Sequence, residues 1–551
     1  MKICRILAKL IIFCLLVFIG IAANQANAQN YVFTHDDTLR GSITPERVWW
    51  DLAFYRLRVD VNIEDSTIKG QNEVQYRVLK PHQVLQIDLQ RPLKITKITQ
   101  DGQPLAFKRD GDAFLVTLTK AQQIGKREAI VVSYEGRPRV AKRPPWDGGF
   151  TWKYDIRTDL FAATSCQGLG ASAWWPCKDH MYDECDSMSF SATLPVPYMA
   201  VSNGRLRYVS KDYNRQRTFE WFVKNPINNY GVNLNMGNYV HWSEVYQGEK
   251  GPLDMDFYCL PENVEKAKVH FKQAHAMMKA FEHWFGPYPF YEDGYKLVEV
   301  PYLGMEHQSS VTYGNGFQNG YLGRDLSGTG WGLKWDFIIV HESGHEWFAN
   351  NITYKDVADM WIHESFTNYS ESLFTEYYYG KAAGAAYVVG CRKLIRNDKP
   401  IIGIYNVNKL GSADMYYKGG NVLHTIRQVI NDDNKWRQIL RGLNKTFYHQ
   451  TVTTQQIEAF MSQQAGRDLS PIFDQYLRDV RVPVLEYKLQ NGKLTHRWAN
   501  CVAGFEMPVK VNGQFLYPTT NWKTEKLKIG RKVEADVNFY VQTRDILKPS
   551  S

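Results

Sequence analysis

The sequence lacks the features that mark membrane-spanning and nucleic-acid-binding proteins. Only residues 10–23 form an uninterrupted apolar run, which is shorter than the roughly 20 residues that a helix needs to cross a bilayer. Lys and Arg (66) exceed Asp and Glu (57) by only nine charges in 551 residues. No basic cluster with interleaved aromatic residues occurs. We therefore expect no nucleic-acid partner.

Cysteine is scarce as well, with 8 residues in the whole chain. Two of them, Cys4 and Cys14, lie in the first 28 residues. The spacing of the Cys166, Cys177 and Cys185 group matches no zinc finger. The sequence is consistent with one disulfide within this group and equally with buried free thiols. The remaining cysteines are Cys259, Cys391 and Cys501.

The first 28 residues have the pattern of a secretory signal peptide. Lys2, Arg5 and Lys9 precede the apolar run, and Ala-Asn-Ala at 26–28 is a small-x-small cleavage site. We predict a mature protein that begins near Gln29, is exported to the periplasm or secreted, and has no stable membrane insertion after cleavage. An uncleaved anchor is the alternative. Loss of the three leader cations lowers the net charge from +9 to +6.

The remaining chain is long enough for several domains and has a soluble composition, with 44% hydrophobic and 22% charged residues. Residues 29–250 alternate apolar and polar positions, as in "RLRVDVNI", which predicts a large and mostly antiparallel sheet domain. Helical periodicity dominates much of 251–480, including one long helix over 262–286 and a helix capped by Thr454. Alternation returns in 481–551, which predicts a small β domain.

The motif His341-Glu342-Ser343-Gly344-His345 follows the apolar segment "WDFIIV" and is predicted to lie on a helix. Histidines at positions i and i+4 project from one helical face, so both imidazoles can reach one Zn²⁺. Glu342 then lies beside the coordination position that a catalytic zinc keeps open for water, where it can act as a base.

A third ligand is needed, and Glu364 is the candidate, with eighteen residues between it and His345. The metzincin pattern is excluded, because Phe348 and Asn351 occupy the positions where that class has glycine and histidine. A second helix running antiparallel to the first would bring Glu364 back to the histidines. The alternative is a solvated Glu364 with two packed histidines.

This combination resembles the zinc aminopeptidase N family, the gluzincin aminopeptidases that include the leukotriene-A hydrolases. The family motif HExxH, eighteen residues, then Glu, stands here unchanged. The segment Leu303-Gly304-Met305-Glu306-His307 resembles the family signature G-x-M-E-N, with leucine and histidine at its two ends. Tyr416-Tyr417-Lys418-Gly419 matches Y-x-K-G, and "SCQGLGASAWWPCKD" resembles a substrate-binding segment of the family.

The resemblance implies a role for each matched residue. His341, His345 and Glu364 would hold one zinc ion per chain, with Glu342 as the general base and Tyr416 as the oxyanion stabiliser, for which Tyr417 is the near competitor. Glu306, flanked by Gly304 and Met305, would bind the α-ammonium of the substrate, and Gln167 would assist, unless Gln167 is only a turn residue.

The resemblance also implies a multidomain α+β fold, with an N-terminal β saddle domain, a thermolysin-like zinc catalytic domain and a small C-terminal β domain. The implied activity is a zinc metallo-aminopeptidase that acts on peptides with a free N-terminus. Three alternatives remain open: a thermolysin-like endopeptidase, an epoxide hydrolase and a non-catalytic binding scaffold.

Overall fold

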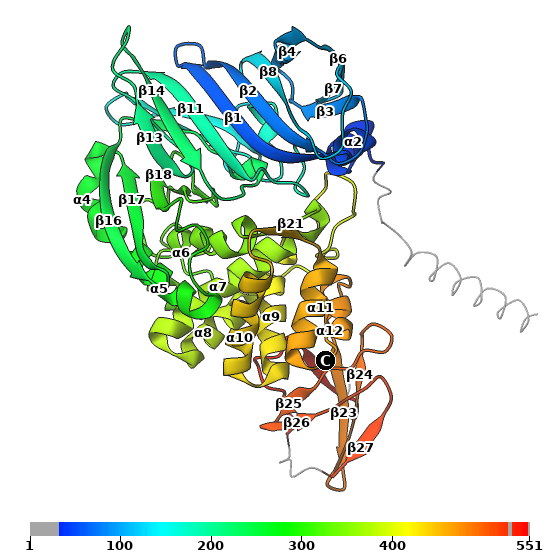
Figure 1. Cartoon of the computed structure of the whole chain (residues 1–551). Coiled ribbons are helices and arrows are strands. Elements are labelled where there is room, and N and C mark those ends of the chain that lie inside the picture. The colour runs from blue at the N-terminus through cyan, green and yellow to red at the C-terminus, as the bar shows by residue number, and fades with distance from the viewer. Residues whose placement is uncertain (1–31, 527–531, 549–551) are drawn as a thin grey trace, which may run out of the picture.

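A computed structural model describes residues 32–526 and 532–548 of the protein. Figure 1 shows three stacked parts: a large β region at the top, a helical region in the middle and a small β region at the bottom. The predicted multidomain α+β class is confirmed. The predicted signal peptide, residues 1–28, lies outside the described residues.

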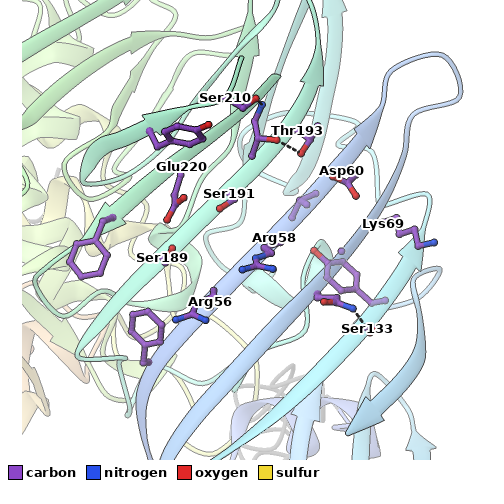
Figure 2. A pocket seen from close by; sticks show the side chains of 18 of the residues that line it. Arg56, Arg58, Asp60, Lys69, Ser133, Ser189, Ser191, Thr193, Ser210 and Glu220 are labelled. Atoms are coloured by element: carbon purple, nitrogen blue, oxygen red, sulfur yellow. Dashed lines mark hydrogen bonds between the residues drawn. The ribbon is translucent and has the colours of Figure 1, made fainter. Parts of the chain in front are cut away.

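An eight-stranded sheet forms the top of the molecule, and its strands alternate between a buried and an exposed face. In β1 the side chains of Leu57, Val59 and Val61 are buried, whereas Arg56 and Arg58 lie on the opposite, polar face shown in Figure 2. The strands, in sheet order, are β13 (Arg205–Val209), β14 (Gln216–Val223), β11 (Ser187–Pro195), β1 (Trp50–Asn62), β2 (Thr67–Val78), β8 (Arg127–Gly136), β4 (Lys94–Gln100) and β5 (Gln103–Pro104).

Two smaller sheets accompany the large sheet in the N-terminal half of the chain. One has the order β3 (Val84–Asp88), β7 (Ala113–Thr117), β6 (Ala106–Asp110). The other has the order β12 (Met199–Val201), β15 (Asn235–Gly237), β10 (Leu160–Ser165), β9 (Gly149–Tyr154). Because buried strand β10 ends at Ser165, it fixes where the following turn, with Gln167, enters the space between the two regions.

A five-stranded sheet lies beside the helices, in the order β16 (Val240–Gly248), β17 (Gly251–Cys259), β18 (Tyr295–Glu299), β20 (Val311–Tyr313), β19 (Gly304–Met305). The short strand β19 is therefore an edge strand. β16 and β17 form one hairpin, so the predicted domain limit at residue 250 falls between two paired strands of this sheet.

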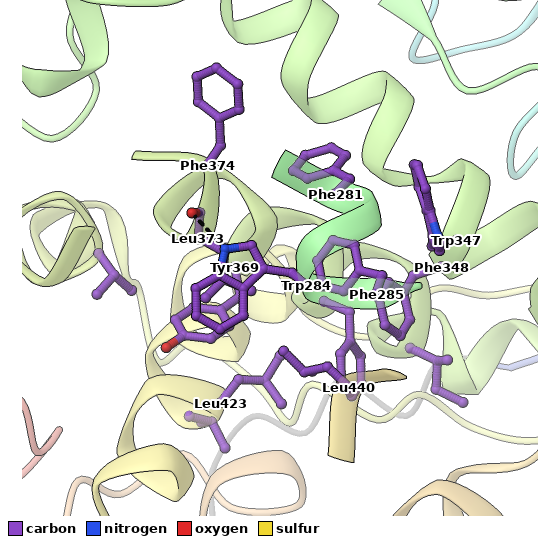
Figure 3. Close-up of a cluster of buried hydrophobic side chains, with 14 of the residues drawn as sticks. Phe281, Trp284, Phe285, Trp347, Phe348, Tyr369, Leu373, Phe374, Leu423 and Leu440 are labelled. Carbon is purple, nitrogen blue, oxygen red and sulfur yellow. Dashed lines mark hydrogen bonds between the residues drawn. The ribbon is translucent and has the colours of Figure 1, made fainter. Parts of the chain in front are cut away.

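The helices of the middle region pack around an aromatic core. Figure 3 shows Phe281, Trp284 and Phe285 in contact with residues of neighbouring helices, and the Trp284 indole N–H donates to the Leu373 carbonyl at 3.0 Å. This core includes residues of the helix that carries Glu364. The helices are α4 (Val264–His270), α5 (Gln273–Phe285), α6 (Phe337–Gly344), α7 (Trp361–Tyr379), α8 (Lys381–Gly390), α9 (Tyr417–Ile430), α10 (Asp433–Thr446), α11 (Thr454–Ala465) and α12 (Ser470–Leu477).

Two details of the helix prediction were wrong. The expected single helix over 262–286 is interrupted between α4 and α5, around Phe271. The predicted cap Thr454 is instead the first residue of α11. Thr453 is the N-cap and forms a capping box with Gln456, since its hydroxyl accepts from the Gln456 N–H while the Gln456 amide oxygen accepts from the Thr453 N–H.

The C-terminal region is a four-stranded sheet beside a two-stranded hairpin. Asn491-Gly492 and Asn512-Gly513 form the turns of two hairpins with positive φ at both residues, as the sequence predicted. The sheet order is β27 (Lys523–Glu525), β24 (Lys493–Ala499), β23 (Val484–Gln490), β28 (Gln542–Asp545), and the hairpin is β25 (Val509–Val511) with β26 (Gln514–Leu516).

The six cysteines within the described residues are free thiols, so of the two alternatives for Cys166, Cys177 and Cys185 the structure has buried free thiols. Among the residues that the structure describes, no helix is both long and apolar enough to cross a membrane.

Candidate metal centre and active site

Helix α6 presents the two histidines of the HExxH motif. Asp336 begins the helix by accepting a hydrogen bond from the Ile339 N–H at 3.0 Å. His341 and His345 then follow one helical turn apart, with ring centroids separated by 5.0 Å. His345 is the C-cap residue of α6, and both rings are buried and face the carboxylates of Glu364 and Glu371 on α7.

Glu364, in the first turn of α7, faces both histidines. Its Oε2 atom lies 3.8 Å from Nε2 of His341 and 3.4 Å from Nε2 of His345. This oxygen is shielded from solvent and accepts no hydrogen bond from any residue that the structure describes. A buried carboxylate oxygen without a donor is costly, and a cation between these three atoms would satisfy it.

The outer nitrogens of both imidazoles have other partners. His341 Nδ1 lies 2.8 Å from Oε1 of Glu371, and His345 Nδ1 lies 3.1 Å from the Phe348 carbonyl oxygen. When each Nδ1–H donates outward, each Nε2 lone pair faces inward, as metal binding requires. Two neutral histidines and one carboxylate are the usual protein ligands of a catalytic zinc, so the donor set fits this metal.

A second group of donor atoms, on Glu306, Glu342 and His345, also lies within metal-binding range. It shares His345 with the first group, so the two groups compete for one ion. Oε1 of Glu306 already accepts hydrogen bonds from the Gln167 amide and from the Tyr230 hydroxyl at 3.1 Å. The first group, whose inward-facing atoms have no such partners, therefore fits an ion better.

Glu342 lies beside the ligands and against the edge strand β19. Burial raises the pKa of its carboxyl group to about 7, although positive charge on His341 acts in the opposite direction. Gly304 allows the close approach of the strand, because a Cβ at this position would lie 2.6 Å from Ile338 and 3.2 Å from the Glu342 side chain. Met305 follows on the same strand and is also buried.

Glu306 continues from β19 into the same space, and Gln167 reaches it from the N-terminal region. One amide nitrogen of Gln167 donates to Glu306 and also, at 2.9 Å, to Oε1 of Glu364. Burial raises the pKa of the Glu306 carboxyl group, and the nearby Glu364 charge raises it further. Burial disfavours ionisation of Glu364 as well, but His345 and His341 hold its pKa below the usual range.

Tyr416 precedes α9, and its ring stacks on that of His341 at a centroid distance of 6.1 Å. Burial, reinforced by Glu364 and Glu306, raises the pKa of its phenol well above the ordinary value, so the hydroxyl remains a proton donor. Tyr417 lies instead near Glu371 and Cys391, whose charges contribute to its own raised pKa after the larger effect of burial. Only Tyr416 of the two lines the cavity described next.

A cavity of about 760 Å³ brings all nine predicted site residues together. They are His341, His345, Glu364, Glu342, Tyr416, Glu306, Gln167, Gly304 and Met305. The rest of the wall includes the exposed Trp146 and the segment 408–411. His307, which replaces asparagine in the resembling signature, is fully buried and does not line the cavity.

Sequence reasoning missed two residues that support the site. Glu371 lies seven residues after Glu364, two turns along the same face of α7, so this spacing could have indicated a partner for a ligand histidine. Tyr230 gave no such signal, because it comes from a short 3₁₀ turn, Asn229–Gly231, in another region of the chain.

Sequence profiles of one peptidase family match two long parts of the chain. The Peptidase M1 N-terminal domain matches residues 53–230, and the Peptidase family M1 domain matches residues 269–476. The chain belongs to peptidase family M1. The resemblance to the zinc aminopeptidases that the motifs indicated is thereby confirmed.

Curated relatives of this M1 chain include the endoplasmic reticulum aminopeptidase 1 of Rattus norvegicus, 21% identical over 546 residues, which covers 89% of this chain and 56% of the relative. The leucyl aminopeptidase of Saccharolobus solfataricus is 20% identical, covering 80% of this chain and 55% of the relative. The chain thus spans about half the length of the curated relatives it matches.

The crystal structure of the M1 zinc metallopeptidase from Deinococcus radiodurans has a TM-score of 0.67 to this protein at 20% sequence identity. The match covers 80% of this chain and 95% of that one, which shows a shared fold. Family membership and the donor set of His341, His345 and Glu364 agree on zinc as the metal of this centre.

Proposed function

We propose that this M1 protein is a zinc-dependent aminopeptidase that removes N-terminal residues from peptides with a free N-terminus. The position of Glu306 carries the proposal. This buried carboxylate lines the same cavity as the three ligand residues and is fixed by Gln167 and Tyr230. A carboxylate held beside a metal site forms a charge-assisted hydrogen bond with a substrate ammonium group.

The link between Glu306 and Glu364 supports cleavage at the first peptide bond. Because one nitrogen of Gln167 contacts both carboxylates, the proposed ammonium site and the metal ligand are only one side chain apart. A bound α-ammonium would leave only the nearest carbonyl group of the peptide within reach of the catalytic groups. An internal peptide bond has no ammonium group to occupy the position beside Glu306.

His341, His345 and Glu364 would hold the zinc ion. A zinc ion bound there lowers the pKa of a water molecule towards neutrality and polarises a carbonyl group. Glu342 lies where it can take the proton from the attacking water and then transfer it to the leaving amine. The raised pKa of Glu342, about 7, suits both halves of this transfer near neutral pH.

Tyr416 would stabilise the negative charge that develops on the carbonyl oxygen. Its phenol is partly buried, lines the cavity and keeps its proton because its pKa is raised. Such a donor contributes most when it faces the oxyanion rather than the ground-state carbonyl group. The Gln167 amide donates to the carboxylates, so its own oxygen is left to accept a hydrogen bond from the substrate ammonium group.

Hydrolysis of aminoacyl-arylamides, measured beside their N-acetylated counterparts, tests the proposal. We expect cleavage of the free-amino substrates, loss of cleavage after treatment with a zinc chelator, and recovery on addition of Zn²⁺. Acetylated arylamides should remain intact, because their uncharged N-terminus offers Glu306 no positive charge to pair with. Efficient internal cleavage of N-blocked peptides would instead identify an endopeptidase.

We further propose that the mature protein is exported, either to the periplasm or to the medium. The support is the leader pattern of residues 1–28. The N-terminal sequence of the protein recovered from each cell fraction tests this proposal. We expect a mature protein that begins near Gln29 outside the cytoplasm, and an intact leader on an active cytoplasmic protein would contradict it.

A further inference from the structure

Helix α2 (His35–Gly41) lies near the beginning of the described chain, yet it contacts two separate segments next to the catalytic cavity. One is the turn of residues 166–172, which carries Gln167. The other is the segment 407–411, of which residues 408–411 line the cavity wall. Neither the metal ligands nor Glu342 belongs to these segments.

Arg40 connects α2 to the turn 166–172. Its guanidinium donates to the Leu169 carbonyl oxygen, and the Leu169 N–H in turn donates to the Gln167 carbonyl at 2.8 Å. Gly170, with φ +93°, lies between Arg40 and the Asp179 carboxylate, and a Cβ there would lie 3.1 Å from Arg40 Nη2 and 2.2 Å from Asp179 Oδ2. The turn is therefore closely fitted to the Arg40 side chain.

Three contacts connect α2 to segment 407–411. The Asn408 N–H donates to the Asp37 carbonyl at 3.0 Å, and the Asn408 side-chain amide, with its oxygen turned towards Arg40, accepts from the guanidinium at 3.0 Å. Gly41 allows the close packing, because a Cβ at this position would lie 2.2 Å from the Val407 carbonyl carbon. α2 and this part of the cavity wall therefore touch backbone to backbone.

The end of α2 is itself held by a buried ion pair. Arg47 is fully buried, donates to the carbonyls of Leu39 and Ser42 at 2.9 Å each, and pairs with Asp88 at 2.6 Å. Asp88 also accepts from the Asp179 N–H at 2.9 Å. Helix α2 and the turn 166–172 are thus both connected to one buried group of charges. Removal of one partner of such an ion pair strongly destabilises a protein.

The Asp179 carboxylate extends this group into the turn. It accepts from the Ala171 N–H at 3.2 Å and from the Ser172 N–H at 3.1 Å. Burial raises the pKa of this carboxyl group, and the positive charge of nearby Arg40 acts in the opposite direction. Arg40 therefore lies where the N-terminal helix, the Gln167 turn and the cavity wall meet.

We propose that Arg40 and Gly41 are positioning residues of the substrate site, and that α2 holds the Gln167 turn and segment 407–411 at the spacing that substrate binding requires. This inference rests on the proposed aminopeptidase function, because it assigns the turn and the wall to substrate binding. It predicts that α2 affects how tightly a substrate binds, while the metal ligands and Glu342, carried by α6 and α7, remain in place.

The experiment compares Arg40→Met, Arg40→Lys and Gly41→Ala with the wild-type protein in arylamide hydrolysis. Arg40→Met should raise KM by roughly fivefold or more, because the charge-assisted bonds that hold the turn are lost, while kcat changes by less than about twofold. Arg40→Lys keeps the charge, so its KM should lie between those of Arg40→Met and the wild type. Gly41→Ala should raise KM in the same way, although alanine favours a helix over glycine.

Thr38→Ala is the matched control on the same helix, because within the described part of the chain the Thr38 side chain donates only to the His35 carbonyl of α2 itself, at 2.9 Å. Its KM should equal that of the wild type. A merely structural role for α2 would lower the fraction of folded enzyme, and thus apparent kcat, in the test variants without changing their KM.

Amide hydrogen exchange provides a readout that does not depend on activity. Arg40→Met and Gly41→Ala should increase exchange in peptides that cover 166–172 and 407–411, while α7 keeps its wild-type protection. If the wild type hydrolyses no arylamide, the proposed function fails, yet exchange still tests the positioning. Wild-type KM in both variants, or unchanged exchange in both segments, would overturn the inference. Should Arg40→Met fail to fold, Gly41→Ala alone decides between these outcomes.

Discussion

The amide nitrogen of Gln167 lies 2.9 Å from Oε1 of Glu364, so a side chain of the N-terminal region bonds directly to a candidate zinc ligand of the helical region. The same nitrogen donates to Glu306. Substrate recognition and metal binding are therefore physically coupled through a single amide group, and this coupling makes Gln167 the first residue to test.

Gln167→Ala should weaken both functions. We expect KM for aminoacyl-arylamides to rise, because the ammonium group loses one acceptor and Glu306 loses the donor that fixes it. Zinc affinity should fall by roughly tenfold, since a partner that orients a ligand is removed. Steady-state kinetics and competition with a zinc chelator measure the two effects. Unchanged KM and unchanged zinc affinity in this variant would mean that Gln167 is only a turn residue.

Glu371→Gln tests the support of the zinc ligands from the opposite side. The carboxylate accepts from His341 Nδ1, and its replacement should lower zinc affinity by roughly 10- to 100-fold. His341→Ala, His345→Ala and Glu364→Ala should lose the metal outright, whereas the wild type should hold about one zinc per chain. Metal analysis of the purified proteins ranks them by zinc content. Full zinc content in all three alanine variants would contradict the assignment of the ligands.

Glu342→Gln should keep the zinc ion and lose nearly all hydrolysis, because the amide cannot accept a proton from the attacking water. The substitution preserves the size of the side chain beside Gly304, so the edge strand should remain in position. Metal content and kcat are measured on the same sample. Retention of more than about a tenth of wild-type kcat would mean that another group is the general base.

Tyr416→Phe should lower kcat by about 10²–10³ while KM changes little, because the hydroxyl acts mainly on the transition state. Tyr417→Phe is the matched control, since it removes the same group one residue away and outside the cavity lining. Measurement of kcat for both variants decides the assignment. A larger loss in Tyr417→Phe would place the oxyanion donor one residue further along the chain.

The sequence could indicate that the three candidate ligands lie together, because they follow local rules. His341 and His345 share a helical face, and Glu364 lies on the next long helix. Gln167 and Glu306 could be predicted only through the resemblance, since they come from segments 139 residues apart whose proximity depends on packing between two regions. The contacts of Arg40 with Leu169 and Asn408 have no local signal at all, because they join segments that are far apart in the sequence.

The most direct test of the aminopeptidase assignment is Glu306→Gln, measured as kcat/KM on a free-amino arylamide, beside wild-type cleavage of an N-acetylated peptide. We expect a loss of kcat/KM of roughly tenfold or more with zinc retained, because a charge-assisted contact of about 1.5–3 kcal/mol is removed without touching a ligand. The acetylated peptide should stay intact. Unchanged kcat/KM in Glu306→Gln, together with efficient internal cleavage of the blocked peptide, would contradict the aminopeptidase assignment.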